Sequence, residues 1–289
     1  MRNLNGKQIG FLAQYAFIRA LQFILSVVPY RLRGWLIGGI AGTLVPLAAG
    51  PRRRMQKNLD LVYPDMDQTE KKRIMRAVAA NAARSLSELL MNAQYSKRHD
   101  LFQISGPGLD VLKKAKAEDK GALIISAHFG QWEAIRHVLM AQGLETGAIY
   151  RENSNPYYEG LFLRNIKFGG EPIVKRSSSG NRVMLKHLRS GGFFALLTDQ
   201  KTHNDATLPF LGHDAWTTTT PAQLGLKMGL PVVPAFATRR PDGVTIDVEF
   251  EDPIAPSSVE EMTIAINNRI EARIRANPGQ WYWMHRRWR

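Results

Sequence analysis

The chain has 289 residues, 44% of them apolar, which is enough to bury one sizeable hydrophobic core and allows one or two domains. The 39 Lys and Arg against 25 Asp and Glu leave a formal net charge of +14, so the expected partner is anionic: nucleic acid, acidic lipid or an acidic carrier protein. The lack of cysteine excludes disulfides, cysteine nucleophiles and thiolate metal sites.

The first apolar stretch covers residues 11–28. At ~1.5 Å per helical residue it is barely long enough to span a bilayer, and an arginine near its middle would cost about 2.5–3.5 kcal/mol in lipid. On a helix, the polar side chains fall in one sector roughly 140° wide; they are Lys7, Gln8, Gln14, Arg19, Gln22 and Ser26. This pattern favours a helix that lies in the membrane interface over one that crosses. A helix packed on the protein's own core is the alternative, and a cleaved signal peptide is disfavoured because Arg19 interrupts the apolar run.

The following segment is mixed in character. A glycine-rich apolar patch at residues 35–47 is too short to span a bilayer, and the basic run at residues 52–57 suits either lipid headgroups or a solvated turn. Asp67 and Glu70 have capping-box spacing and predict the start of a helix that runs to Met91. We therefore expect a membrane-associating helical segment over residues 1–50 and a single larger domain over residues 51–289.

From residue 121 onward, strand-like segments alternate with segments of helical spacing. The expected strands are 121–127, 147–150, 172–174, 192–198 and 230–237, and the expected helices are 132–142, 156–168, 181–189 and 221–228. The strict alternation at residues 244–250 predicts a half-exposed antiparallel edge strand, and residues 264–275 form a closing amphipathic helix. The sequence thus predicts an α/β fold with a mostly parallel central sheet flanked by helices.

The most informative stretch runs from Gly121 to Glu133. Its continuous apolar run is typical of a strand buried on both faces of a parallel sheet, and it delivers His128 to the carboxyl end, where open α/β sheets bind ligands. Residues five apart on one helix point about 140° away from each other, so His128 and Glu133 can pair only across a turn at Gly130.

A histidine paired with a carboxylate is suited to proton transfer from a hydroxyl. The neutral imidazole takes the proton, and a carboxylate on its other nitrogen fixes the tautomer and stabilises the cation. The alternative is a purely structural role, in which the histidine is hydrogen-bonded at a strand end and the glutamate is favoured by the helix N-terminus. The spacing His-x4-Glu after an apolar strand resembles the lysophospholipid acyltransferase superfamily. Within it, His128-Phe-Gly-Gln-Trp-Glu133 is similar to the late acyltransferases of lipid A biosynthesis, the lauroyl and myristoyl transferases.

Other strand ends should contribute to the same crevice, namely Arg151 after one strand and Asp199-Gln200 after another. The resemblance also includes Arg164, which it associates with Glu133 in catalysis and substrate binding; a guanidinium there could hold a phosphate or an oxyanion, or be a surface cation. No metal is expected, because Asp199 has only His203 and Asp205 as nearby candidate ligands.

The C-terminal residues 280–289 mix three tryptophans and one tyrosine with arginines and a histidine. Such a mixture suits a membrane interface or a phosphorylated headgroup, and it could also stack on bases. Its ending Trp-x-His-Arg-Arg-Trp resembles the C-terminus of the lipid A acyltransferases, so that the likeness extends over roughly residues 30–289.

The resemblance implies a membrane-associated O-acyltransferase at the cytoplasmic face of the bacterial inner membrane. It would move a fatty acyl chain from an acyl-acyl carrier protein to a hydroxyl of a lipid A precursor, without metal or redox cofactor. His128 would be the general base, Glu133 its orienting carboxylate, and Arg151, Arg164, Asp199 and Gln200 would bind substrate. Another anionic phospholipid or glycolipid is the alternative acceptor. A serine hydrolase is disfavoured by the lack of Gly-x-Ser-x-Gly, and a nucleic-acid-binding protein by the lack of any binding motif.

Overall fold

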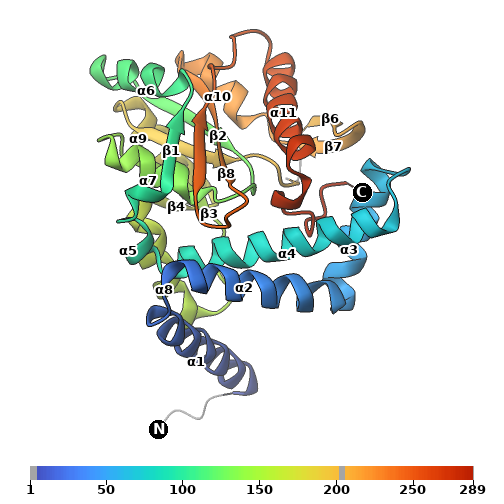
Figure 1. The fold of residues 1–289 in the computed structure, drawn as a ribbon. Coiled ribbons are helices and arrows are strands. Elements are labelled where there is room, and N and C mark those ends of the chain that lie inside the picture. The colour runs from blue at the N-terminus through green and yellow to red at the C-terminus, as the bar shows by residue number, and fades with distance from the viewer. Residues whose placement is uncertain (1–4, 202–205, 289) are drawn as a thin grey trace.

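The computed structural model describes residues 5–201 and 206–288, and a seven-stranded sheet in the order β1-β9-β8-β2-β5-β3-β4 forms its centre (Figure 1). The strands are β1 (Phe102–Ser105), β2 (Ala122–Ser126), β3 (Thr146–Tyr150), β4 (Ile173–Lys175), β5 (Phe193–Leu197), β8 (Val232–Arg239) and β9 (Ile246–Phe250). Among the described residues, every pairing in this sheet is parallel except that of β8 with β9. The predicted α/β fold with a mostly parallel sheet is confirmed.

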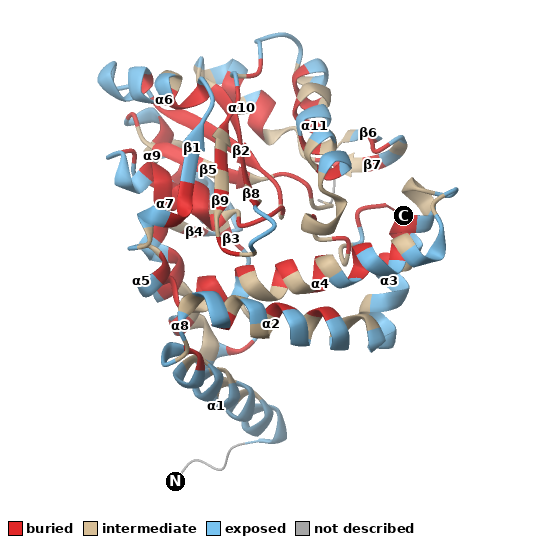
Figure 2. Cartoon of the chain, viewed as in Figure 1, coloured by how far each residue is buried: buried red, intermediate tan, exposed pale blue. Residues whose placement is uncertain are grey.

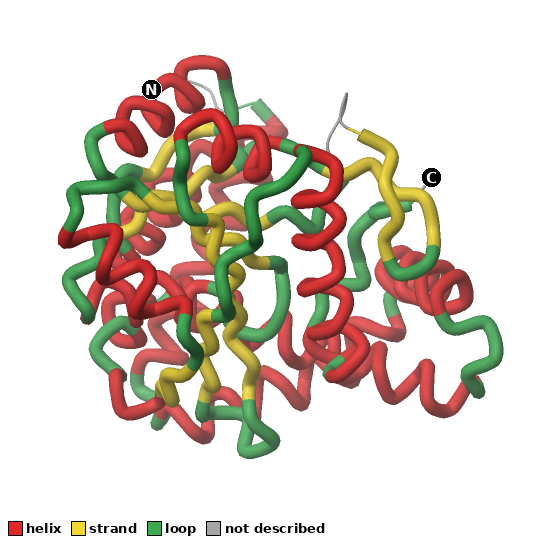
Figure 3. Tube along the Cα trace, turned by 90° about the horizontal axis from the view of Figure 1, so that it is seen from above, coloured by secondary structure: helices red, strands yellow, loops and turns green. Residues whose placement is uncertain are grey.

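Helices precede, connect and follow these strands. Before β1 come α1 (Gly6–Ser26), α2 (Tyr30–Leu44), η1 (Val45–Leu47), α3 (Ala49–Val62), α4 (Gln68–Leu90), α5 (Asn92–Tyr95) and η2 (His99–Leu101). The later helices are α6 (Gly108–Ala117), α7 (Glu133–Ala141), α8 (Pro156–Ile166), η3 (Lys167–Gly169), α9 (Ser178–Arg189), α10 (Thr220–Met228), α11 (Val259–Ala276) and η4 (Pro278–Gln280). Seen from above, the strands run through the middle of the molecule with helices on both sides (Figure 3).

Each face of the sheet carries its own hydrophobic core. Leu123 and Ile125 of β2 face one core, which includes Ile270 of α11. Ala122 and Ile124 alternate to the other face and pack with α6 and α7. Strand β2 is therefore buried on both sides, which is why its sequence is continuously apolar rather than alternating.

Two parts of the β structure differ from the prediction. Strand β9 is antiparallel to β8 as expected, but it is not an edge, because β1 pairs with its other side. Only the first of the four β1 residues is buried, so this short strand has no pattern that a sequence could reveal. The second difference is a hairpin of β6 (Ala206–Phe210) and β7 (His213–Thr217), whose two-residue turn holds Leu211 and Gly212 at positive φ.

Helix α2 lies along α4, whereas α1 extends away from the rest of the protein (Figure 1). Gly42 permits the close approach of α2, since a Cβ there would lie 3.1 Å from the Arg76 carbonyl oxygen. Helix α1 is long and apolar enough to cross a membrane, but only 6% of its apolar window is buried (Figure 2). It is therefore not a core helix. It contacts the body along one side, where Leu25 is buried and Gln22 Nε2 donates to the Leu90 carbonyl at 2.7 Å.

The C-terminal tryptophans are part of the core. Trp281, Trp283 and Trp288 are 1%, 0% and 8% exposed, and their rings contact one another. The interpretation of this segment as an aromatic surface for membrane or bases is therefore wrong for the tryptophans. Composition alone could not separate the two cases, because an interface belt and a buried aromatic cluster use the same residues.

Candidate active site

The register of two neighbouring strands brings His128 and Asp199 together. Ser126 of β2 is paired with Leu197 of β5, so His128 and Asp199 each lie two residues beyond the same register position. The backbone N–H of His128 donates to Asp199 Oδ2 at 3.0 Å, and His128 Nδ1 is 2.9 Å from Asp199 Oδ1. The carboxylate therefore binds both the backbone and the ring of the histidine.

Asp199 is buried and fully engaged. Besides its two bonds to His128, it accepts a hydrogen bond from the Trp281 indole N–H at 2.8 Å, and its side chain is only 2% exposed. Burial acts to raise the pKa of Asp199, but the adjacent His128 and the hydrogen bonds from the ring, from Trp281 and from the backbone N–H outweigh burial and hold this pKa below its usual value. The carboxylate is thus ionised at neutral pH.

This arrangement assigns the tautomer of His128. Since Nδ1 faces a carboxylate, it carries the proton, and Nε2 keeps its lone pair. The side-chain nitrogen of Gln200 lies 3.2 Å from Nε2 and donates to it. The His128 side chain is 25% exposed, between the rings of Trp132 and Tyr282 at centroid distances of 5.3 and 6.5 Å. Such a histidine is ready to accept a proton from a hydroxyl that approaches the open side of the ring.

Glu133 does not orient His128. It begins α7 after the turn at Gly130, as predicted, but its carboxylate forms a buried ion pair with Arg136 at 3.0 Å. Arg136 also donates to the carbonyls of Thr146 and Ile166 at 3.1 Å each. Burial raises the pKa of Glu133, and the ion pair with Arg136 opposes the rise. The expected His128–Glu133 pairing is wrong. Strand β5 lies directly beside β2, and the residue that lies level with His128 in the register of the two strands is Asp199, whose carboxylate binds the ring.

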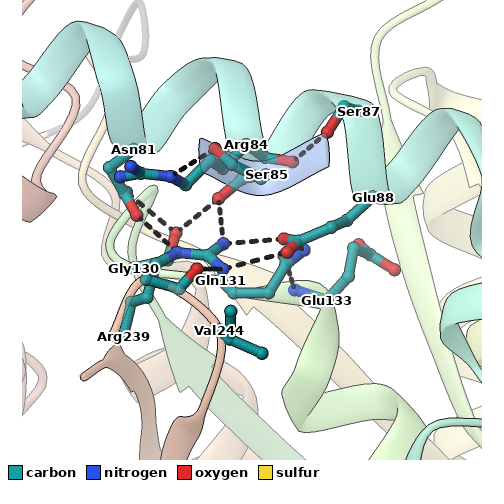
Figure 4. A network of polar contacts seen from close by, with 12 residues as sticks. Asn81, Arg84, Ser85, Ser87, Glu88, Gly130, Gln131, Glu133, Arg239 and Val244 are labelled. Atoms are coloured by element: carbon teal, nitrogen blue, oxygen red, sulfur yellow. Dashed lines mark hydrogen bonds and ion pairs between the residues drawn. The ribbon is translucent and has the colours of Figure 1, made fainter. Parts of the chain in front are cut away.

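The loop between His128 and Glu133 is held by a buried polar network (Figure 4). Glu88 of α4 forms an ion pair with Arg239 of β8 at 2.7 Å and accepts a hydrogen bond from Gln131 of the loop. The Gly130 carbonyl accepts from Ser85 at 2.8 Å, also from α4. Gly130 has φ +55°, and a Cβ there would lie 1.8 Å from the Ala237 carbonyl oxygen, so only glycine fits.

The remaining predicted residues are not in contact with His128. Arg151 follows β3 and Arg164 lies on α8; both are exposed, and neither has an ion-pair or hydrogen-bond partner within residues 5–201 and 206–288. In the same described ranges no three His, Asp or Glu side chains come together as metal ligands. His203 and Asp205, the suggested companions of Asp199 in a metal site, lie outside the described residues.

Sequence reasoning did not find Trp281 or the Glu88–Arg239 pair as parts of the site. Trp281 lies 82 positions from Asp199 and Arg239 lies 151 from Glu88. No local spacing signals such contacts. Asp199 and Gln200 were predicted from the rule that the carboxyl ends of neighbouring strands converge.

The fold and the site define an α/β protein in which a histidine, held through Nδ1 by a buried carboxylate, lies at the carboxyl end of a central parallel strand with the geometry that a general base requires. The family model described as bacterial lipid A biosynthesis acyltransferase matches residues 9–289. The chain belongs to this family, and it is therefore an enzyme that transfers acyl groups.

Characterised relatives agree with this family. The chain is 24% identical over 268 residues to the lipid A biosynthesis acyltransferase of Haemophilus influenzae, covering 90% of this chain and 83% of the relative. It is 24% identical over 243 residues to the lipid A biosynthesis lauroyltransferase of Escherichia coli K12, with 81% and 78% covered. The lipid A biosynthesis myristoyltransferase of the same organism is 20% identical over 270 residues, with 90% and 82% covered.

Proposed function

We propose that this enzyme transfers a fatty acyl chain from a thioester donor to a hydroxyl of a lipid A precursor, with His128 as general base. The observation that carries the proposal is the bond of His128 Nδ1 to the buried carboxylate of Asp199, which leaves Nε2 as the acceptor. The acceptor hydroxyl gives its proton to Nε2 as its oxygen attacks the thioester carbonyl. The tetrahedral intermediate then expels the thiolate, which takes the proton from the imidazolium.

Gln200 and Asp199 have different parts in this reaction. Asp199 stabilises the imidazolium without leaving its three hydrogen-bond donors, so little reorganisation accompanies proton transfer. Gln200 stands beside Nε2, where its amide N–H can turn to a substrate oxygen when the hydroxyl takes its place. Arg151 and Arg164 are assigned to the anionic parts of the substrates, because each is an exposed guanidinium without an ion-pair partner in the described chain.

Acyl-acyl carrier protein is the proposed donor. The net charge of +14 favours a partner with a large acidic surface, because steering between extended opposite charges raises the association rate. With this donor, kcat/KM falls as salt rises while kcat at saturation changes less. The matched comparison is the coenzyme A thioester of the same chain, and a salt-insensitive preference for coenzyme A contradicts the assignment.

The cytoplasmic face of the inner membrane is the proposed location, with residues 1–50 as the membrane-associating segment and residues 51–289 as the acyltransferase domain. The support for membrane association is the row of exposed apolar side chains from α1 to η1; those at least 58% exposed are Phe17, Phe23, Ile24, Val27, Trp35, Ile40, Leu44 and Leu47. An apolar patch of this extent would promote aggregation if it faced water, whereas at a membrane surface the lipid covers it.

The acceptor is tested with the purified enzyme and one thioester donor. Mass spectrometry follows a lipid A precursor and an anionic phospholipid presented together in mixed micelles. The proposal predicts that the precursor gains one acyl chain as an ester and that the phospholipid is unchanged. Acylation of the phospholipid alone would assign the enzyme to a different acceptor.

A further inference from the structure

A cavity of about 270 Å³ lies between α2, α4 and the α5 turn, apart from His128. Its wall includes Tyr30 and Arg33 of α2, Glu88 of α4, and Tyr95 and Arg98 from the turn that follows. The proposed reaction uses none of these side chains as a proton carrier. Two of them have polar atoms that the described protein leaves without a partner.

Arg33 is the first of these. It is 8% exposed, yet no carboxylate of the described chain forms an ion pair with it. One terminal nitrogen contacts the Met91 sulfur and lies 3.4 Å from Gln94 Oε1, both of them neutral acceptors, and Nε has no hydrogen-bond partner. A buried guanidinium without a counter-charge is costly, so proteins normally pair it or use it to hold an anion.

Tyr95 is the second. Its side chain is 2% exposed, and its hydroxyl has no hydrogen-bond partner among the described residues. The ring stacks on Tyr30 at a centroid distance of 6.2 Å, so that ring packing explains its burial but not its hydroxyl. Phenylalanine would serve equally well for packing alone, so the unpaired hydroxyl of this cavity-lining tyrosine is a donor left available for a polar ligand.

The acidic groups nearby are already neutralised. Glu88 lines the cavity, but it is bonded to Arg239 at 2.7 Å, to Gln131, and to the Tyr30 hydroxyl at 2.6 Å. Arg98 donates to Asp100 through Nε at 2.9 Å and through one terminal nitrogen at 2.8 Å, and its other terminal nitrogen has no partner among the described residues. The charges within the Glu88–Arg239 and Arg98–Asp100 pairs balance each other, so Arg33 leaves the cavity with one uncompensated positive charge.

We propose that this cavity binds a phosphate group, held by Arg33 together with Arg98 and the Tyr95 hydroxyl. Several donors arranged around one small space suit the oxygens of a phosphate, and guanidinium groups are the preferred donors for it. Both guanidinium groups lie over the Tyr30 ring, at 5.4 and 5.2 Å from its centroid, so that one ring helps to position both.

The position of the cavity limits the possible sources of such a phosphate to two. Arg33 belongs to the first turn of α2, next to the bend that joins α1 to α2. Val27, which lies in this bend, is 73% exposed, so an apolar side chain close to the first turn of α2 is available to meet lipid. A phosphate at this depth is carried by a lipid headgroup or enters free from solution, and both sources present the same oxygens. The proposal is about binding and does not depend on the acceptor of acyl transfer.

The test measures the melting temperature of the full-length enzyme in neutral detergent. Inorganic phosphate is titrated against chloride at equal ionic strength, and in a second arm short-chain phosphatidic acid is doped into phosphatidylcholine micelles. The variant is Arg33→Gln, and the matched control is Arg31→Gln, which removes one exposed charge from the same helix. We expect a saturable rise of Tm that weakens in apparent affinity about tenfold or more in Arg33→Gln and stays within about twofold in Arg31→Gln.

A second variant keeps the test decisive if Arg33→Gln does not fold. Tyr95→Phe retains the ring and removes only the unpartnered hydroxyl, so it should fold and still bind several-fold more weakly. An Arg33-dependent rise with phosphatidic acid at concentrations where inorganic phosphate has no effect identifies the lipid as the source, and the same rise with inorganic phosphate identifies free phosphate. No rise with either probe, or an equal rise in Arg33→Gln and Arg31→Gln, would overturn the proposal.

Discussion

The Asp199 carboxylate has three donors bonded to two oxygens: the His128 ring, the His128 backbone N–H and the Trp281 indole. Two of these donors are fixed by the fold, because the backbone N–H belongs to the end of β2 and the indole belongs to the buried tryptophan cluster. The carboxylate is therefore immobile, and the ring that it holds has one orientation and one tautomer.

Asp199→Asn tests this tautomer assignment. An amide cannot accept from all three donors, and once it turns its NH₂ toward the ring, His128 must accept at Nδ1 and carry its proton on Nε2, where it cannot act as a base. We expect kcat for acyl transfer to fall by about 10²–10⁴-fold in a protein that still folds. The control is Asp252→Asn, which changes an exposed aspartate. Near-normal turnover in Asp199→Asn would mean that His128 is not the base or that Asp199 does not orient it.

At the level of residues, the sequence predicted the members of the site better than their pairing. His128 follows an apolar run that only a doubly buried strand explains, and the convergence of strand ends predicted that Asp199 and Gln200 would be near it. The choice between Glu133 and Asp199 as the partner depends on which strand lies beside β2. That neighbour is β5, although β3 follows β2 along the chain, and strand order in a sheet has no local signal in a single sequence.

Helix α7 is fixed at its start by the Glu133–Arg136 pair, and Arg136 also ties the helix to the backbone of β3 and of the last residue of α8. Both side chains are nearly inaccessible, at 7% and 3% exposure. Breaking a buried pair by removing one charge leaves the other uncompensated, which is strongly destabilising. The role of Glu133 that these contacts support is structural, at the element that follows the His128 loop.

Glu133→Gln should therefore act mainly by lowering the stability of the fold. We expect a loss of about 3–5 kcal/mol in the free energy of unfolding, measured by chemical denaturation. Glu260→Gln, at an exposed position in the first turn of α11, is the control and should change stability by less than about 1 kcal/mol. If Glu133→Gln abolished acyl transfer while its unfolding curve matched that of the unchanged enzyme, Glu133 would act on the reacting atoms instead.

Another buried group of α7 makes stability depend on pH. His137 is 1% exposed, its Nε2 lies 2.7 Å from Asn92 Oδ1, and burial lowers the pKa of His137 to about 3. A histidine with a lowered pKa stabilises the fold above its unfolded pKa of about 6.5, and this contribution is lost as the pH falls toward the folded value. At pH 5 the loss is on the order of 2 kcal/mol.

The measurement is the free energy of unfolding between pH 8 and pH 5 for the enzyme and for His137→Gln, which retains a donor for Asn92 but does not titrate. The unchanged enzyme should lose more stability than the variant over this range, by roughly the amount given by the pKa shift. Identical pH dependence of the two proteins would show that His137 titrates normally in the fold.

Among the elements, those with a local apolar pattern were predictable, and those buried by distant contacts were not. The five predicted parallel strands and the helices between them are present, because their apolar runs and turn residues follow local rules. Strand β1 and the β6–β7 hairpin have mixed burial patterns and were missed. The C-terminal tryptophans were misassigned because their burial depends on α3, α4 and the hairpin, all far away in the sequence.

At the scale of the molecule, α1 and α2 each bury one side against the protein and present apolar side chains on the other. Asn155 Nδ2 donates to the Phe11 carbonyl at 2.8 Å and to Gln14 Oε1 at 2.9 Å, and Leu25 is buried, so that α1 is attached along one side and leaves its other, apolar side uncovered. We expect this attachment to hold α1 along the membrane surface rather than across it.

Deleting residues 1–28 should move the enzyme from the membrane fraction toward the soluble fraction while the remaining domain keeps its fold. The fold is retained because few residues of α1 are buried against the body. Fractionation and circular dichroism of the truncated and full-length proteins measure the two effects. If the truncated protein stayed fully membrane-bound, the attachment would be assigned to α2 alone. If reporters at the two ends of the full-length protein lay on opposite sides of the membrane, α1 would span it.

The central claim is that His128 is the base in acyl transfer to a lipid A precursor. Its most direct test is the single-turnover rate of transfer from acyl-acyl carrier protein to that precursor by purified His128→Ala, beside His99→Ala, which removes an exposed histidine. We expect a rate lower by about 10²–10⁴-fold in His128→Ala, with an unchanged melting temperature, and a normal rate in His99→Ala. A normal rate in His128→Ala would contradict the claim.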